Sequence, residues 1–146
     1  MKKSFLPLVL LAALVFGARF YFTKPELPLI KVLSCADITK SCGNEMLTIQ
    51  FAEKPQVMKL LHLNLHINRA NRIKDVHVDF AMQDMEMGLN RYRLIQSNQS
   101  GDWQAEVTLP LCVQGRSDWN MLLEIEAGEK VQRFQLPFSA KANRDN

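Results

Sequence analysis

The sequence has few of the residue patterns that build catalytic or nucleotide-binding sites. Its 6 glycines are scattered one to a turn, and no glycine-rich loop of the kind that cradles a phosphate is present. Histidine occurs only 3 times, and no G-x-S-x-G elbow accompanies a histidine and a carboxylate. These absences argue against nucleophilic catalysis, and we expect the protein not to be an enzyme.

The chain of 146 residues also lacks a run of basic residues. Its formal net charge is +3, but Lys2, Lys3 and Arg19 lie in or beside the first hydrophobic segment. Removing those three from the 18 basic residues leaves 15, which equals the number of acidic residues. A neutral domain has no electrostatic footprint for phosphates, so we exclude nucleic acid as a partner.

The N-terminal hydrophobic segment contains no acidic residue. Lys2 and Lys3 precede an apolar run over residues 5–18, a pattern that retains the N-terminus in the cytoplasm and exports the remainder. Residues 4–22 come close to the roughly 20 residues that span a bilayer. We therefore expect residues 1–22 to form an uncleaved single-pass anchor in the inner membrane, with the C-terminal domain in the periplasm. Cleavage as a signal segment near Gly17 is the alternative.

Cysteine is scarce too. Cys35, Cys42 and Cys112 would lie in an oxidising compartment, where one disulfide and one spare thiol is the simplest arrangement. The spacing of Cys35 and Cys42 closes a loop easily and matches neither a C-x-x-C redox motif nor a zinc knuckle. We predict a structural disulfide between them, although the spacing also leaves pairing of either one with Cys112 open.

Seven short segments alternate apolar and polar residues with period two, and turn-forming residues bound each one. No helical pattern of useful length occurs outside the anchor. The sequence therefore predicts an all-β fold, an antiparallel immunoglobulin-like β-sandwich of about seven strands. We expect a linker and cysteine loop over 23–44, the sandwich over 45–140 and a disordered tail over 141–146. The predicted strands are 46–51, 58–67, 76–82, 89–95, 103–109, 121–125 and 131–138.

Five aromatic residues fall at positions suited to fill the core between the two sheets. They are Phe80, Trp103, Trp119, Phe134 and Phe138.

Residues 80–88 place three thioethers, Met82, Met85 and Met87, where one predicted strand ends and another begins. Thioether sulfur is a soft ligand, and a turn can direct several such side chains to one point, which suits Cu(I). His77 and Cys112 are candidate additional ligands. The alternative is packing, because methionine fills irregular gaps and Met82 is in phase with the apolar residues of its strand.

Residues 78–88, VDFAMQDMEMG, and the later residues 101–105, GDWQA, resemble the FixH/YtkA-like membrane-anchored proteins. The resemblance covers roughly residues 45–140. It implies a small β-sandwich on a short anchor and a role in copper delivery to respiratory oxidases.

The sequence thus predicts a membrane-anchored periplasmic accessory protein that binds copper through its methionine-rich turn, for respiratory oxidase assembly or metal handling. The alternative is a non-catalytic protein-interaction module of the cell envelope with no metal. A third hypothesis is a thiol-based redox role for Cys35 and Cys42.

Overall fold

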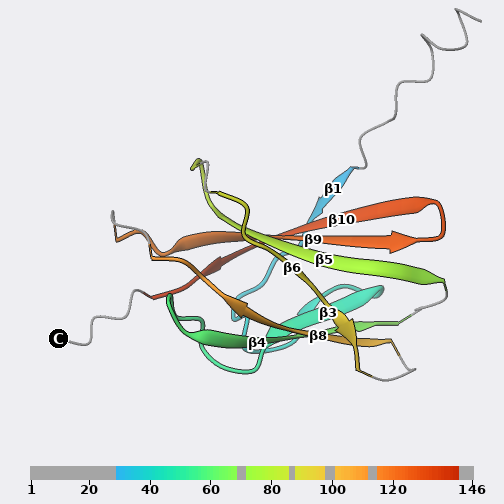
Figure 1. The fold of residues 1–146 in the computed structure, drawn as a ribbon, viewed down its shortest axis with the longest axis horizontal. Coiled ribbons are helices and arrows are strands. Elements are labelled where there is room, and N and C mark those ends of the chain that lie inside the picture. The colour runs from blue at the N-terminus through green and yellow to red at the C-terminus, as the bar shows by residue number, and fades with distance from the viewer. Residues whose placement is uncertain (1–28, 69–71, 86–87, 98–100, 112–114, 142–146) are drawn as a thin grey trace, which may run out of the picture.

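The structure is a computed structural model that describes residues 29–68, 72–85, 88–97, 101–111 and 115–141. Across these residues ten strands form two five-stranded sheets that pack face to face as a β-sandwich (Figure 1). The anchor predicted over 1–22 lies outside the described residues. Within them, the structure contains no helix long and apolar enough to cross a membrane.

One layer, which we call the β9 sheet, has β9 at its centre and is antiparallel except for the parallel pair β1–β10. Its strands, in spatial order, are β1 (Ile30–Val32), β10 (Lys130–Ser139), β9 (Asp118–Ala127), β5 (Ile73–Met82) and β6 (Arg91–Arg93).

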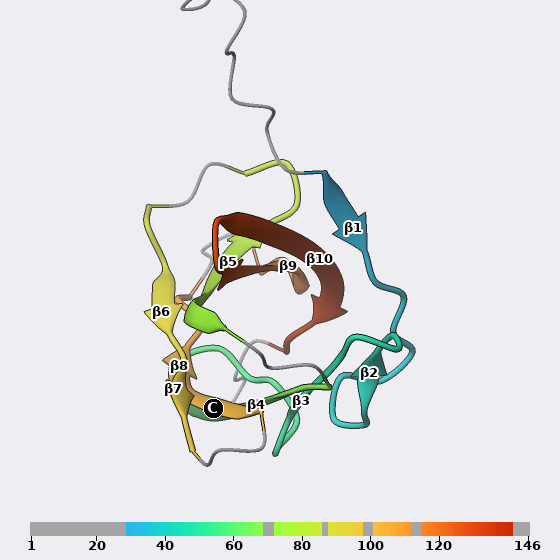
Figure 2. The same ribbon diagram turned by 90° about the vertical axis from the view of Figure 1, so that its right-hand side faces the viewer.

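The other layer, the β4 sheet, is antiparallel throughout. Its strands, in spatial order, are β2 (Cys42–Gly43), β3 (Leu47–Phe51), β4 (Leu60–Ile67), β8 (Asp102–Thr108) and β7 (Ile95–Gln96). Figure 2, an end view, shows β5, β9 and β10 lying over β3, β4 and β8.

The period-two pattern explains which side chains meet between the sheets. On β4, Leu61, Leu63 and Leu65 are buried while His62 and Asn64 face solvent, as successive strand residues must. The described core contains no buried polar or charged residue. The predicted aromatic core is largely confirmed, with four of its members buried and one partly buried. The buried four are Phe80, Trp103, Trp119 and Phe134, and the partly buried one is Phe138.

All seven predicted segments contain strands, but one of them divides. Residues 89–95 supply β6 to the β9 sheet and the start of β7 to the β4 sheet, with the buried Leu94 where the chain crosses between them. The strands β1 and β2 were not predicted. Each has only two or three residues, which is too short for a recognisable alternation.

The segment 23–44 contributes to the core as well as connecting to it. Leu33, Ile38 and Cys42 are buried in the same cluster as the strand residues. At the other terminus, Lys141 forms an isolated parallel bridge with Gln56, and residues 142–146 lie outside the described residues.

Candidate functional site

The methionine-rich segment begins inside the core. Met82 is the last residue of β5, lies opposite Trp119 of β9 and is 2% exposed. The chain then turns through Asp84 at a φ of 56°, and the N–H of Met85 donates to the carbonyl of Met82 at 3.4 Å. The Met85 side chain is partly buried against the core, and Met87 lies outside the described residues. Met82 therefore packs as a core residue.

His77 lies on the opposite face of β5 from Met82. The two are five positions apart, and an odd separation in a strand places side chains on opposite faces. The His77 side chain is 21% exposed, and its Nε2 lies 3.9 Å from Oδ2 of Asp75. The structure does not bring His77 and Met82 together. Cys112, the other candidate ligand, lies outside the described residues.

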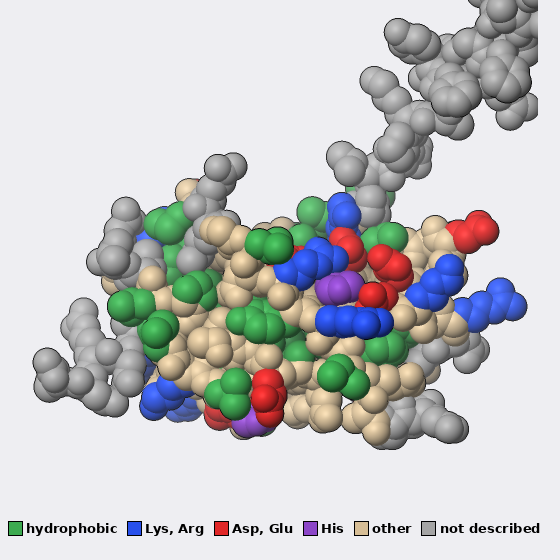
Figure 3. Space-filling model, in the orientation of Figure 1, with side chains coloured by type: hydrophobic (Ala, Val, Ile, Leu, Met, Phe, Trp, Pro, Cys, Tyr) green, Lys and Arg blue, Asp and Glu red, His purple; other side chains and the backbone are tan. Residues whose placement is uncertain are grey.

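A network of ion pairs covers the outer face of the β9 sheet, where acidic and basic side chains gather over β5 and β6 (Figure 3). Arg91 on β6 donates to both Asp79 and Glu124 at 2.9 Å, and Arg133 on β10 donates to Glu124 at 2.8 Å. Burial raises the pKa of Glu124, but hydrogen bonds from the two arginines outweigh it and hold that pKa below its ordinary value. Burial dominates for Asp79, whose pKa is raised despite Arg91. Opposite charges thus partner one another across this face.

The other two histidines lie on the outer face of the β4 sheet and pair with different carboxylates. His66 Nδ1 lies 2.5 Å from Asp102, and His62 Nδ1 lies 3.3 Å from Glu53. Nowhere in the described part of the chain do three His, Cys, Asp or Glu side chains form a group that could hold a metal ion.

Cys35 and Cys42 form the predicted disulfide, with their Cα atoms 5.4 Å apart. Within their loop, the hydroxyl and the N–H of Thr39 donate to Asp37 at 2.7 and 3.0 Å, which holds the pKa of Asp37 below its usual range. Cys35 is partly exposed and Cys42 is buried. Reduction would leave a buried thiol at Cys42, and burial disfavours the thiolate that exchange chemistry requires. This arrangement favours a structural bridge.

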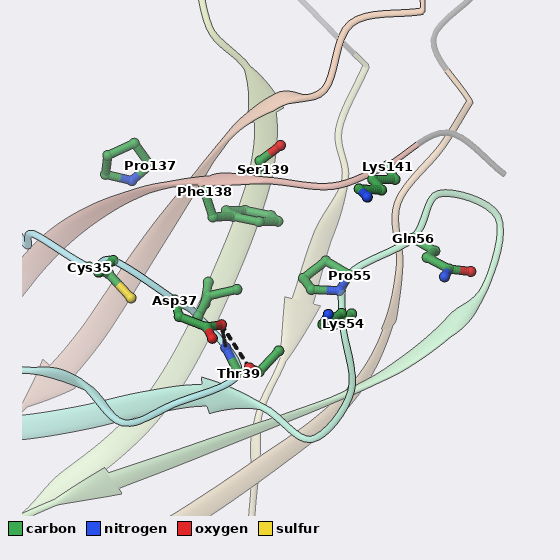
Figure 4. A pocket seen from close by; sticks show the side chains of 12 residues that line it. Cys35, Asp37, Thr39, Lys54, Pro55, Gln56, Pro137, Phe138, Ser139 and Lys141 are labelled. Carbon is green, nitrogen blue, oxygen red and sulfur yellow. Dashed lines mark hydrogen bonds between the residues drawn. The ribbon is translucent and has the colours of Figure 1, made fainter. Parts of the chain in front are cut away.

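A cleft of about 480 Å³ lies between the cysteine loop and the end of β10. Figure 4 shows the Phe138 ring above Asp37 and Thr39 of the cysteine loop. Lys54 and Lys141 lie to the right of these residues in the same view. The lining mixes charges of both signs with an aromatic ring, without a converging set of donors. We assign it no ligand.

Apolar side chains gather at the end of the sandwich where β4 and β6 begin, on the left of Figure 3. Met58 is 65% exposed, Leu60 55%, Leu89 89% and Leu111 57%. We call the surface formed by these four residues the apolar end.

Two residues of the apolar end, Met58 and Leu89, line a shallow hollow of about 540 Å³. The Tyr92 hydroxyl donates to the carbonyl of Thr108 at 2.8 Å and accepts from the Thr108 N–H at 3.1 Å, which fixes the ring in the lining. No charged side chain is among the lining residues, which are Met58, Gly88, Leu89, Asn90, Tyr92, Thr108 and Pro110.

Sequence reasoning missed this surface, although one signal was present. Leu60 falls in the polar phase of its strand, together with His62 and Asn64, so the alternation itself marks an apolar residue that faces solvent. Met58 was predicted inside that strand. It precedes β4 and has a φ of 61°, in the left-handed region.

No protein-family model matches the chain, and no curated protein matches its sequence. The resemblance to the FixH/YtkA-like proteins therefore stays a prediction that depends on residues 78–88 and 101–105.

Proposed function

We propose that the protein is a non-catalytic binding module of the cell envelope, held at the membrane by its N-terminal segment, which contacts a protein partner through the apolar end. One observation carries the proposal: Met58 and Leu89, each more than half exposed, line a single hollow. The exposed Leu60 lies two residues after Met58, and the exposed Leu111 directly follows the lining residue Pro110. Apolar side chains exposed around one hollow are typical of a surface that a partner covers.

The chemistry of the hollow indicates what the partner presents. The described residues that line it carry no charge and include Met58 and Tyr92, residue types that are enriched in the cores of protein interfaces. The thioether of Met58 adapts its shape to a neighbouring surface, whereas the Tyr92 ring is held by its hydrogen bonds. We therefore expect the partner to insert an apolar or aromatic side chain.

The strand order supports a binding module. We further propose that the sandwich is of the immunoglobulin-like type, with β3-β4-β8-β7 as strands A, B, E, D and β10-β9-β5-β6 as strands G, F, C, C′. In antibody variable domains, loops at one end of such a sandwich form the binding site. This is an analogy of fold, so the surface remains the reason for the proposal.

The sequence and the disulfide support the location. Lys2 and Lys3 ahead of the apolar run 5–18 are typical of a segment that directs the rest of the chain across the membrane. A disulfide between Cys35 and Cys42 fits an oxidising compartment such as the periplasm.

Site-specific photo-crosslinking of the full chain in its native membrane tests the proposal. A photoreactive residue replaces Leu89 or Leu111 at the apolar end, or Glu106 on the outer face of the β4 sheet as the control. We expect the same partner adduct at both apolar positions and none at the control. Absence of an adduct at both, or equal adducts at all three, would refute the proposal.

A second substitution shows whether the surface itself is recognised. Met58→Asp introduces a charge at the hollow and is expected to abolish the adduct formed at position 89. Met46→Asp makes the same change at an exposed methionine that lines a different cavity and leaves the adduct unchanged.

Copper binding is the second candidate function, and one observation favours it. Met58 lines the same hollow as Gly88, which directly follows the methionine-rich turn. Thioethers from two separate chain segments thus lie near one end of the sandwich, where Met85 is also partly exposed. Soft sulfur ligands suit Cu(I) in an oxidising compartment, and the buried Met82 would then support the turn rather than bind the ion.

An anaerobic Cu(I) competition titration on the detergent-purified full chain tests this candidate. The variant carries leucine at Met58, Met85 and Met87, which preserves apolar volume, and Met46→Leu is the control. Tight binding that the triple variant loses and the control keeps would establish a copper site. Equal weak binding in all three proteins would refute the copper site, and binding of a protein partner would then be the one function proposed.

A further inference from the structure

Another cavity, of about 270 Å³, opens between the two sheets at the end of the sandwich opposite the apolar end. Figure 1 shows this end at the right, where β5 begins and β9 joins β10. Leu47, Ile67, Ile125 and Phe134 line it, and all four are buried members of the core. The cavity is therefore continuous with the apolar interior, and its walls come from both layers.

One neutral polar side chain and two side chains of opposite charge lie beside this apolar lining. Gln132 lines the cavity and shares the inner face of β10 with Phe134, and the exposed Glu45 lines it as well. The Lys31 ammonium lies 5.7 Å from the centroid of the Phe134 ring. An apolar interior beside groups that can hydrogen-bond or pair with a charge suits an amphiphile, with its chain inside and its head outside.

The size of the cavity limits what enters. Pockets that enclose most of a drug-sized ligand have volumes of roughly 300–1,000 Å³, so this one suits the end of a single chain.

The position of the cavity indicates where such a chain comes from. β1 begins at Ile30, paired with Arg133, which lies between Gln132 and Phe134 on β10. The chain therefore enters the sandwich beside the cavity. Residues 23–29 separate Ile30 from the apolar segment, and seven residues span at most about 25 Å.

We propose that the cavity between the sheets binds the end of one acyl chain, with the carboxylate or phosphate head of the amphiphile near Lys31 and Gln132. The inference rests on the membrane attachment proposed above, which keeps the cavity within reach of the lipid surface. The exposed apolar residues Leu29 and Ile30, at the point where the described chain enters β1, fit the same orientation.

Photolabelling in vesicles tests the proposal with the full chain. One arm uses phosphatidylcholine and phosphatidylglycerol vesicles that contain a phosphatidylcholine with a diazirine near the end of one acyl chain. The other arm adds diazirine-bearing palmitic acid to the protein in unlabelled vesicles. Labelled peptides are then mapped by mass spectrometry. Ala127→Leu fills the cavity, and Ala81→Leu makes the same change on the outer face of β5.

We expect label on peptides that contain Ile67 or Ile125, reduced at least about tenfold by Ala127→Leu and unchanged by Ala81→Leu. Label from the first arm alone identifies a membrane lipid as the source, and label from the second alone identifies a free fatty acid. If Ala127→Leu does not unfold cooperatively, Ile73→Phe fills the cavity instead.

Label spread evenly over the surface, or label unaffected by filling the cavity, would overturn the proposal and favour an apolar side chain of a protein partner as the occupant. Co-sedimentation with vesicles distinguishes a failure of the proposed membrane attachment from a failure of the proposed acyl-chain site. Protein that stays in the supernatant refutes the membrane attachment, whereas co-sedimenting protein without cavity label refutes only the acyl-chain site.

Discussion

Replacing Met82 by alanine separates core packing from metal binding. Met82 is 2% exposed and lies across from Trp119, so truncation removes buried contacts and leaves a cavity. Such truncations cost about 2–5 kcal/mol of the free energy of unfolding. For a domain of this size each kcal/mol lowers the melting temperature by roughly 3–5 °C. We expect the melting temperature of Met82→Ala to fall by roughly 6–25 °C.

Two controls bracket this effect. Met82→Leu keeps the apolar volume and is expected to cost less than about 1.5 kcal/mol. Met58→Ala truncates an exposed methionine and should change stability by no more than about 0.5 kcal/mol. Urea unfolding followed by tryptophan fluorescence measures all three variants, because Trp103 and Trp119 are buried in the folded protein and become exposed when it unfolds.

The measurement is made with chelator present, so that metal plays no part. A loss below about 0.5 kcal/mol for Met82→Ala would refute the packing role and return Met82 to the candidate ligands.

Three further predictions concern the disulfide, a glycine and the charged face. Replacing Cys35 and Cys42 by alanine releases a link across a sequence separation of 7 and lowers the free energy of unfolding by about 2–3 kcal/mol in urea titrations, and an unchanged midpoint would contradict a structural bridge. Gly43→Ala places a Cβ against the carbonyl oxygen of Leu47, and we expect a loss above about 2 kcal/mol in the same assay. The folded state lowers the pKa of Glu124, so its ionised carboxylate stabilises the fold fully above about pH 4.5, and this effect is lost as the pH falls through the folded pKa. Glu124→Gln should therefore reduce the change in the free energy of unfolding with pH below about pH 4.5, as measured by urea titrations at several pH values.

Strand content followed from the sequence because one face of each long strand is apolar and the other is polar. On β5, Val76, Val78 and Phe80 alternate with His77 and Asp79, and the structure buries only the first set. This pattern is local, so it needs no knowledge of the partner strand.

The missed elements depend on distant partners. β1 exists because Ile30 pairs with Arg133, about a hundred positions later, and three residues carry no period of their own. The division of 89–95 into β6 and β7 likewise depends on where the two sheets lie, since Leu94 is buried between them.

The candidate site shows the same limit in another form. The parity of His77 and Met82 was readable from the sequence, since five positions along a strand place two side chains on opposite faces. The apolar end could not be predicted from the sequence, because Met58, Leu89 and Leu111 come from three separate connections between strands. Only the fold places these connections at one end of the sandwich.

The apolar end and the cavity between the sheets lie at opposite ends of β4, and their functions should be separable. Leu60 belongs to the first and Ile67 to the second, and seven steps of about 3.4 Å put them roughly 24 Å apart. Leu89→Asp should abolish only the partner adduct, and Ala127→Leu only the acyl label. Their effects on stability should add within about 0.5 kcal/mol in the double variant. A coupling above about 1 kcal/mol, or loss of both readouts from either single change, would mean that the two ends act as one site.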